Sequence, residues 1–318
     1  MLFEPRKNLK PNEYPDLLEF KNAIRQAYWV HEEFETEFMS DVQDFHVTMT
    51  DFERQVVTRA MLAIAQIEVN VKQFWGDIFK HIPKPEVGAV GYTFAESEVR
   101  HSDAYSHLLE LLGLNEEFES ITQYGAIADR IEYLEDYTAK QDNYPMTLLL
   151  FSVFIEHVSL FSQFLIMMAF NRHRNLLKGI SNAVEATSKE EQIHGEFGLR
   201  LIEIMRQETP EKFGADFEAH VLRACRKAYK AEKKIVDWIY EGGDLDFLPR
   251  SQVENFLKDR FNSSLQRVGL DPEFEVDSTN PTAWFDEEIL SSSHVDFFHK
   301  RPTSYSKNNR SYTAEDLF

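Results

Sequence analysis

Two histidines in this sequence follow a glutamate by three positions. Of the eleven histidines, only His101, which follows Glu98, and His194, which follows Glu191, have such a partner. Residues three apart on a helix share one face, so each pair can direct a carboxylate and an imidazole at a single ion. Two such pairs can arise by chance in a chain with 54 acidic residues, so alone they are only a moderate indication of a metal site.

A further carboxylate stands in the most apolar stretch of the chain, residues 147–170, which carries Glu156 near its middle. The length of this stretch fits a membrane span. His157, Gln163 and three serines within it, and the hydrophilic chain around it, favour instead a core helix of a soluble protein. Because burying an unpaired ionised carboxylate is costly, Glu156 is expected to face a metal or a partner.

Glu68 interrupts an apolar stripe on an earlier predicted helix. This helix begins at Thr50 with capping residues and is predicted to run to about residue 80. Its apolar residues follow at alternating steps of four and three, and Glu68 takes the one slot missing between Ile64 and Val71. The competing interpretation of Glu68 is an ion pair with Lys72 on a partly exposed face.

The spacing of these residues predicts a four-helix bundle around two metals. Glu68 lies 30 residues before Glu98, and Glu156 lies 35 residues before Glu191, which suits two helical hairpins with the carboxylates at similar depth. Two helices then give one Glu each and two give Glu-x-x-His, the arrangement of dinuclear carboxylate proteins of ferritin-like fold. Four carboxylates and two imidazoles suit iron or manganese and suit zinc poorly. Three nearby candidates are out of helical phase with this face: Glu96, Glu190 and His157.

The rest of the chain is predicted to be all-α. The chain has only 12 Gly and 11 Pro, with long periodic segments between them. These segments predict helices at about 20–38, 92–112, 113–138, 174–206, 212–240 and 250–268. Residues 81–91, with two prolines and two glycines, are expected to break the helical structure, and the periodicity is lost after residue 269. A net charge of −20 argues against binding nucleic acid. The N-terminus lacks an apolar signal core and Cys225 is the single cysteine, so a cytoplasmic protein without membrane attachment is expected.

Tyr105 is predicted to lie beside the metals. It follows His101 by four residues and Glu98 by seven, on the same helix face. Without a metal site, a buried core tyrosine with a hydrogen-bonded hydroxyl would be the preferred interpretation. Three apolar residues are expected to make a dry wall nearby, although packing explains them equally well: Phe94, Leu160 and Phe164.

With these residues the chain resembles the small, radical-generating subunit of class I ribonucleotide reductase, from Trp29 to the C-terminus. Glu98-x-x-His101-x-x-x-Tyr105 is similar to that family's ligand pair and radical tyrosine. The remaining ligands fall at Glu68, Glu156, Glu191 and His194. Outside the site, GLDPEFEVDSTNPTAWF (269–285), DFFHKRPTSYSK and the terminal YTAEDLF resemble the family's C-terminal segments. Ferritins and fatty-acyl desaturases share the core but not this tail.

The resemblance implies a function. A dinuclear metal centre (Mn/Mn, Mn/Fe or Fe/Fe), activated by an oxygen species, would store a one-electron oxidant and pass it to a cysteine of the large catalytic subunit, which reduces ribonucleotides to deoxyribonucleotides. It also implies a homodimer, a ferritin-like domain at 21–290 and a docking tail at 291–318. Residues 1–20, rich in Pro, Asn and charged residues, are predicted to form an extended arm. Trp29 and Glu190 match residues of the transfer path, and Tyr305, in preference to Tyr312, matches the tail tyrosine.

Two positions depart from the family's commonest form. Glu68 and Glu190 each stand where that form has Asp. Glu at the first ligand position resembles subgroups that keep the oxidant on a Mn/Fe or Mn/Mn pair, which leaves open whether Tyr105 stores it. Two other functions remain as alternatives: a stand-alone dinuclear oxidase or oxygenase, and a metal-storage or purely structural helical protein.

Overall fold

The computed structural model describes residues 1–69, 71–139 and 144–289. In this part of the chain the regular structure is helical, and the only β-pairing is an isolated bridge between Leu245 and Leu248. The main elements are α1 (Leu18–Gln26), α2 (Glu35–Gln43), α3 (Asp51–Ile67), α4 (Val71–His81), α5 (Pro85–Leu112), α6 (Asn115–Glu119), α7 (Gly125–Ala139), α8 (Tyr144–Leu150), η6 (Phe151–Ser159), α9 (Phe161–Arg174), α10 (Lys178–Glu208), α11 (Ala215–Ile239) and α12 (Arg250–Arg267). Shorter turns are η1 (Pro15–Leu17), η2 (His31–Phe34), η3 (Asp44–Thr48), η4 (Ile121–Gln123) and η7 (Pro210–Lys212).

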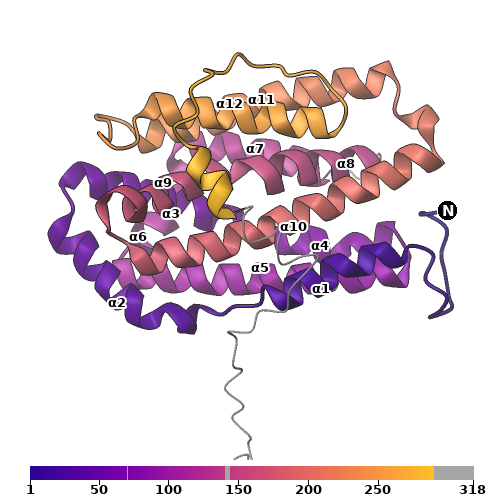
Figure 1. Ribbon diagram of the computed structural model, residues 1–318, viewed down its shortest axis with the longest axis horizontal. Helices are drawn as coiled ribbons and strands as arrows, with labels where there is room; N and C mark the ends of the chain where they lie inside the picture. The colour runs from indigo at the N-terminus through magenta and orange to yellow at the C-terminus, as the bar shows by residue number, and fades with distance from the viewer. Residues whose placement is uncertain (70, 140–143, 290–318) are drawn as a thin grey trace, which may run out of the picture.

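The helices form stacked layers (Figure 1). In this view α11 and α12 lie at the top, α7 and α8 lie below them, and α5 lies near the bottom with α1 and α4 beside it. The long helix α10 crosses the molecule and packs against η6, α9 and α5, while α3 packs against α5 and α9. The predicted all-α, ferritin-like architecture is thus confirmed in the described residues, and its centre lies where α3, α5, η6 and α10 meet.

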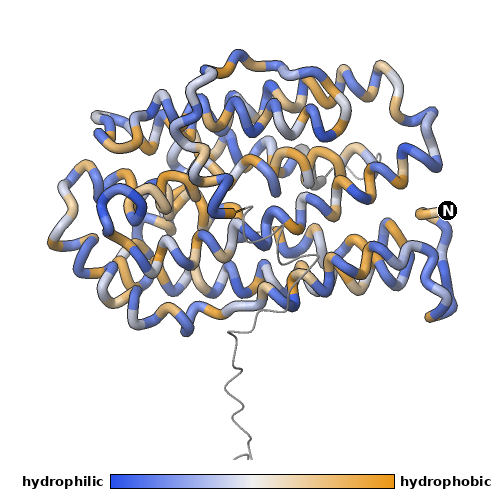
Figure 2. The backbone as a smooth tube through the Cα atoms, viewed as in Figure 1, coloured by the Kyte–Doolittle hydropathy of each residue, from blue (hydrophilic) through white to orange (hydrophobic). Residues whose placement is uncertain are grey.

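The apolar stretch forms the middle of this bundle. Its chain, Tyr144–Arg174, is long and apolar enough to cross a membrane, yet its apolar window is wholly buried inside the molecule. Figure 2 shows it as a largely hydrophobic path between more mixed helices. The prediction of a core helix is confirmed, because neighbouring helices cover all its sides.

Several predicted helix boundaries were wrong. The helix that begins at the Thr50 capping box ends at Ile67, and α4 starts a new helix at Val71, so Glu68 stands at a helix end rather than inside a helix. The helix predicted from residue 92 begins already at Pro85, a residue type favoured in the first turn of a helix. The helix predicted at 20–38 is interrupted by the non-helical residues 27–30, and the one predicted at 113–138 is replaced by α6, η4 and α7. In addition, residues 283–289 are helical, although the aperiodic sequence there predicted no element.

Glycine in α5 explains the second error. A Cβ at Gly91 would collide with the Ile78 side chain and lie 2.6 Å from the Trp75 carbonyl oxygen. The absence of a side chain therefore lets α5 pack closely on α4. In the sequence this glycine indicated a turn, but its role is a close helix contact inside a regular helix.

The centre of the apolar stretch is not α-helical. Residues Phe151–Ser159 form a π-helix, η6, which contains Glu156. π-helical turns are rare and are found frequently at functional sites. Two arginines donate hydrogen bonds to its backbone carbonyls: Arg130 of α7 to Ser159 at 3.2 Å, and Arg260 of α12 to His157 at 2.7 Å. These donors hold the widened turns in place around the carboxylate.

Gly195 of α10 lets this π-helix approach. A Cβ at Gly195 would overlap the imidazole ring of His157. We therefore expect Gly195→Ala to lower the free energy of unfolding by about 2–3 kcal/mol, because the well-packed core cannot move aside freely. Urea denaturation followed by circular dichroism measures this. Gly125→Ala, where a Cβ meets nothing within 4 Å, is the matched control and should change stability by less than about 0.5 kcal/mol.

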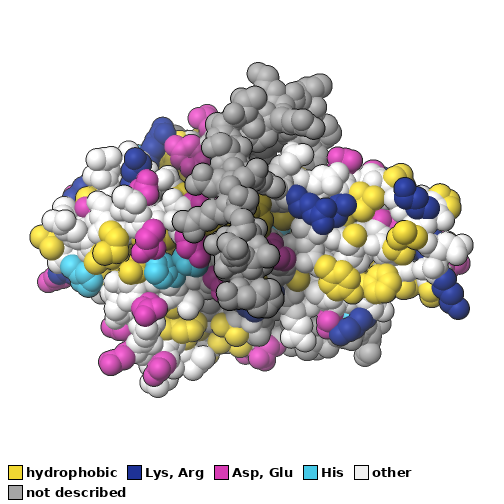
Figure 3. Space-filling view, turned by 90° about the horizontal axis from the view of Figure 1, so that it is seen from below, with side chains coloured by type: hydrophobic (Ala, Val, Ile, Leu, Met, Phe, Trp, Pro, Cys, Tyr) yellow, Lys and Arg dark blue, Asp and Glu magenta, His cyan; other side chains and the backbone are white. Residues whose placement is uncertain are grey.

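The face seen from below carries mixed side chains. Figure 3 shows acidic, basic and hydrophobic groups interspersed on its coloured part.

The N-terminal arm packs against the helical body. Leu2 is fully buried, and the Glu86 carboxylate of α5 accepts hydrogen bonds from the backbone N–H groups of Glu13 at 2.8 Å and Tyr14 at 3.1 Å. The first fourteen residues thus form a docked arm without helix.

Candidate metal centre

Four elements bring the six predicted ligands together in the core. Each of the six is at most 3% exposed. Glu68 comes from the end of α3, Glu98 and His101 from α5, Glu156 from η6, and Glu191 and His194 from α10. The carboxylates from these elements thus lie at similar depth in the bundle, as the 30- and 35-residue spacings between them predicted.

The six side chains divide into two groups that could each hold one ion. The first consists of Glu68, Glu98, His101 and Glu191; the second consists of Glu98, Glu156, Glu191 and His194. Within each group one ligand atom per residue lies within 4.8 Å of all the others. Glu98 and Glu191 belong to both groups, so they are the residues that would bridge two ions.

Both imidazoles direct Nδ1 at the shared carboxylates. Nδ1 of His101 lies 3.1 Å from Oε1 of Glu191 and 3.4 Å from Oε2 of Glu98. Nδ1 of His194 lies 3.1 Å from Oε1 of Glu98 and 3.4 Å from Oε2 of Glu191. The two groups are therefore arranged alike around the bridging pair.

Several polar atoms at the centre have no hydrogen-bond partner among the described residues. Both carboxylate oxygens of Glu68 and of Glu98 are buried without one, as are Oε1 of Glu191 and Nδ1 of each histidine. Unsatisfied buried polar atoms are rare and destabilising, and here they point at common centres. Metal ions would satisfy all of them, and oxygen-rich ligands with two imidazoles fit iron or manganese.

Outer contacts fix the orientation of the ligands. Nε2 of His194 lies 3.0 Å from the Ser97 hydroxyl, and Nε2 of His101 lies 2.7 Å from Oε2 of Glu190. The indole N–H of Trp75 donates to Oε1 of Glu156 at 2.9 Å. Partners of this kind hold ligand rings and carboxylates in place and tune their basicity.

Electrostatics favour uptake of cations. Burial raises the pKa of Glu68 and of Glu156 well above the ordinary value, and neighbouring carboxylates add to this. Burial lowers the pKa of His101 and His194, but contacts with surrounding carboxylates outweigh it and raise the pKa of both. The metal-free centre therefore holds protons, and binding of metal would release them.

A chain of contacts leads from His101 toward the surface. Oε2 of Glu190 also accepts the indole N–H of Trp29 at 3.0 Å, and the Arg100 guanidinium donates to the other Glu190 oxygen at 2.9 Å. The Trp29 and His101 rings lie nearly parallel, with centroids 5.9 Å apart. Next to Trp29, Tyr28 is exposed and packs on Arg100. Glu190 thus links the imidazole to the tryptophan and stays outside both ligand groups.

Tyr105 is 1% exposed. Its hydroxyl donates to the Thr187 hydroxyl at 3.1 Å. Burial raises the pKa of the phenol, and the charges of Glu68 and Glu191 raise it further, so the phenol keeps its proton. The structure thus places Tyr105 in the electrostatic field of the ligands, in a dry surrounding.

The alternative explanation of Glu68 does not hold. Lys72 donates to the backbone carbonyl of Glu68 and to Ser102, and the Glu68 carboxylate has no ion pair in the described residues. Glu96 pairs with Arg100 and His157 faces Gly195, so neither joins a ligand group. The Phe94 ring lies 4.3 Å from that of His194, and Leu160 and Phe164 are buried as expected. Tyr305 and Tyr312 lie outside the described residues.

Sequence reasoning missed several side chains that support the ligands. Thr187 lies one turn before Glu191 on α10, so helical spacing alone could have found it. Trp75 lies seven residues after Glu68, but the helix break between them makes that spacing uninformative. Ser97 and Arg100 adjoin ligands on α5 without a signal that marks them.

Fold and site together define a dinuclear metal carboxylate protein of the ferritin-like class. The family model "Ribonucleotide reductase, small chain" matches residues 6–281. The chain therefore belongs to the ribonucleotide reductase small-chain family.

Individual relatives agree with this. A "Probable ribonucleoside-diphosphate reductase small subunit" of Invertebrate iridescent virus 3 is 25% identical, over 96% of this chain and 86% of its own. The ribonucleoside-diphosphate reductase subunit beta of Chlamydia pneumoniae is 25% identical, over 72% of this chain and 69% of its own. Among solved structures, the ribonucleotide reductase R2 subunit of Clostridium botulinum has a TM-score of 0.78 at 17% identity, covering 87% of this chain and 89% of its own. Dimanganese(II)-NrdF of Streptococcus sanguinis has a TM-score of 0.77 at 15% identity, covering 88% and 99%.

Proposed function

We propose that this chain is the radical-generating small subunit of a class I ribonucleoside-diphosphate reductase. The observation that carries the proposal is the set of unpartnered ligand atoms in two groups, connected through His101, Glu190 and Trp29 toward the surface. Membership of the small-chain family supports it. Iron, manganese or one of each would occupy the two groups.

The chain's own residues have separable tasks in this function. The four carboxylates and two imidazoles hold the ions, and Glu98 and Glu191 keep them adjacent. When bound, the metal pair supplies one-electron oxidation driven by an oxygen species. Buried apolar residues such as Phe94 exclude water from the site. In this proposal the Glu190 carboxylate, which accepts the Trp29 N–H and contacts Nε2 of His101, couples the two rings, so that a proton can move together with an electron that crosses this chain.

Two residues outside the ligand set complete the proposed path. Tyr105 is the candidate store for the oxidant on the protein, and the metals themselves are the other candidate. Electron paramagnetic resonance of Tyr105→Phe distinguishes them: a lost tyrosyl signal with lost activity assigns the store to Tyr105, and full activity assigns it to the metals. Tyr305 is the candidate relay to the large catalytic subunit, with which a homodimer of this chain would assemble.

The C-terminal segment supplies the experiment that tests the proposed function. We expect deletion of residues 299–318 to lower ribonucleotide reduction with the large subunit by at least about 100-fold, since docking and relay would both be lost. The metal content should not change, because none of the ligands lies in this segment.

Point variants separate docking from relay. Tyr305→Phe should abolish turnover while binding of the large subunit persists, and Tyr312→Phe should retain turnover. Full turnover by the shortened chain, or loss of its metal, would contradict the proposed function.

A further inference from the structure

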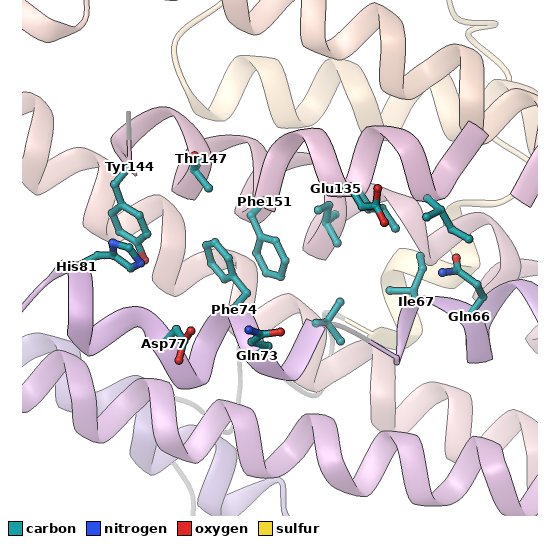
Figure 4. A pocket seen from close by; sticks show the side chains of 14 residues that line it. Gln66, Ile67, Gln73, Phe74, Asp77, His81, Glu135, Tyr144, Thr147 and Phe151 are labelled. Carbon is teal, nitrogen blue, oxygen red and sulfur yellow. The ribbon is translucent and has the colours of Figure 1, made fainter. Parts of the chain in front are cut away.

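A cavity of about 330 Å³ lies between the α3–α4 junction, α7 and the α8–η6 segment (Figure 4). This volume is in the range of small-molecule sites. Its walls combine apolar side chains with polar groups, and fourteen residues line it: Gln66, Ile67, Val71, Gln73, Phe74, Asp77, His81, Ile131, Leu134, Glu135, Tyr144, Thr147, Phe151 and Ile155.

Aromatic rings with nearly parallel planes make up one wall. Phe74 and Phe151 stack with an interplanar angle of 14°, and His81 and Tyr144 stack with an angle of 12°. The two pairs are aligned, since Phe74 and Tyr144 differ by 15° with centroids 6.4 Å apart. In Figure 4 the four side chains follow one another along the cavity. Because these rings cover one another's faces, a planar conjugated molecule would pack against their edges, an edge-to-face arrangement that aromatic groups favour.

Two buried polar atoms that line the cavity lack hydrogen-bond partners in the part of the chain that the structure describes. They are Oε1 of Gln66 and the hydroxyl of Tyr144, on side chains of residues only 7% and 8% exposed. The two residues lie toward opposite ends of the cavity in Figure 4. The amide oxygen can only accept a hydrogen bond, whereas the phenol can donate one. An occupant with a donor at one end and an acceptor at the other would satisfy both.

The charges around the cavity disfavour anions. Glu135 and Asp77 line it, no lysine or arginine is among its described lining residues, and the nearby Lys80 pairs with Asp77 at 2.7 Å. Burial lowers the pKa of His81, which keeps its imidazole neutral at pH 7. We propose that this cavity binds an uncharged planar aromatic compound, oriented by hydrogen bonds to Gln66 and Tyr144.

The site is distinct from the metal centre but adjoins it. Trp75 packs edge-on against Phe74 and Phe151, with centroids 5.2 and 5.6 Å away, and its indole N–H donates to Glu156. Trp75 thus stands between the aromatic wall and a metal ligand. The binding test below needs no turnover, so its failure leaves the proposed reductase function untouched.

7-Hydroxycoumarin is a suitable probe, because this planar bicycle carries a hydroxyl donor at one end and a carbonyl acceptor at the other. Titration of the full-length protein at pH 7, where His81 is neutral, followed by the anisotropy of probe fluorescence, should give saturable one-to-one binding with a dissociation constant below about 1 mM. Coumarin-3-carboxylate, a planar anion, should not compete.

Variants test the two hydrogen bonds. Gln66→Leu and Tyr144→Phe should each raise the dissociation constant about fivefold, as expected for loss of one hydrogen bond. Tyr229→Phe on α11, remote from the cavity, is the matched control and should leave it unchanged. Ile131→Trp, which fills the cavity from the partly exposed face of α7, should abolish binding. No saturable binding, or binding that none of these variants weakens, would overturn the proposal.

Discussion

Replacing Glu191 by alanine is expected to empty both metal positions at once. Glu191 belongs to both ligand groups, and its carboxylate lies within 3.1 Å of His101 and 3.4 Å of His194. Loss of a shared ligand leaves each ion with too few donor atoms. Loss of a residue that only hydrogen-bonds to a ligand typically lowers metal affinity 10- to 100-fold. Loss of a bridging ligand should therefore lower the affinity more, by at least about 1,000-fold. Reductase activity should fall to background.

Metal analysis of purified, reconstituted protein measures this effect. The wild type should carry both ions, whereas Glu191→Ala should retain less than about a tenth of that metal. Glu203→Ala, an exposed position on the same helix that pairs with Arg200, is the control and should keep full loading. Glu156→Ala should lose mainly one ion, because Glu156 serves only the second group. Unchanged metal content in Glu191→Ala would refute its bridging role.

The second large effect is expected at Trp29, with metal content left intact. Trp29→Phe keeps an aromatic ring in a buried position but removes the N–H that Glu190 accepts at 3.0 Å. Proton-coupled steps through a positioned group typically contribute 10²–10⁴-fold, so turnover with the large subunit should fall by about 100-fold or more. Glu190→Gln should have a similar effect. If the amide oxygen faces His101 and Trp29, the amide NH₂ group faces the Arg100 guanidinium, and neither of these two donors can accept a hydrogen bond from the other.

Trp238→Phe is the control for this series, because the Trp238 indole N–H has no hydrogen-bond partner among the described residues and lies outside the path. Steady-state turnover and metal analysis on the same samples separate transfer from assembly. Metal loss in Trp29→Phe would assign this residue a structural role, and normal turnover would exclude it from the path.

The ligand set could be predicted because its signals are local. Glu98 with His101, and Glu191 with His194, are readable from the i, i+3 geometry of a helix, and Glu156 from the cost of a carboxylate in an apolar segment. The all-α architecture follows equally from periodicity. These inferences needed no knowledge of neighbouring elements.

The remaining features depend on tertiary packing. The π-helix around Glu156 is stabilised by arginines from α7 and α12, which lie far away in the sequence. Gly91 gives a turn signal although it serves a close contact between α4 and α5. The sequence is also misleading at Glu68, because the apolar stripe continues in helical phase past this residue although the helix ends there. Local patterns do not reveal such contacts.

Anomalous diffraction from crystals of the metal-loaded protein would locate the ions directly. We expect two peaks per chain: one among Glu68, Glu98, His101 and Glu191, and a second among Glu98, Glu156, Glu191 and His194. Data on both sides of the iron and manganese absorption edges would identify each ion. A single peak, or peaks away from the Glu98 and Glu191 carboxylates, would contradict the dinuclear centre.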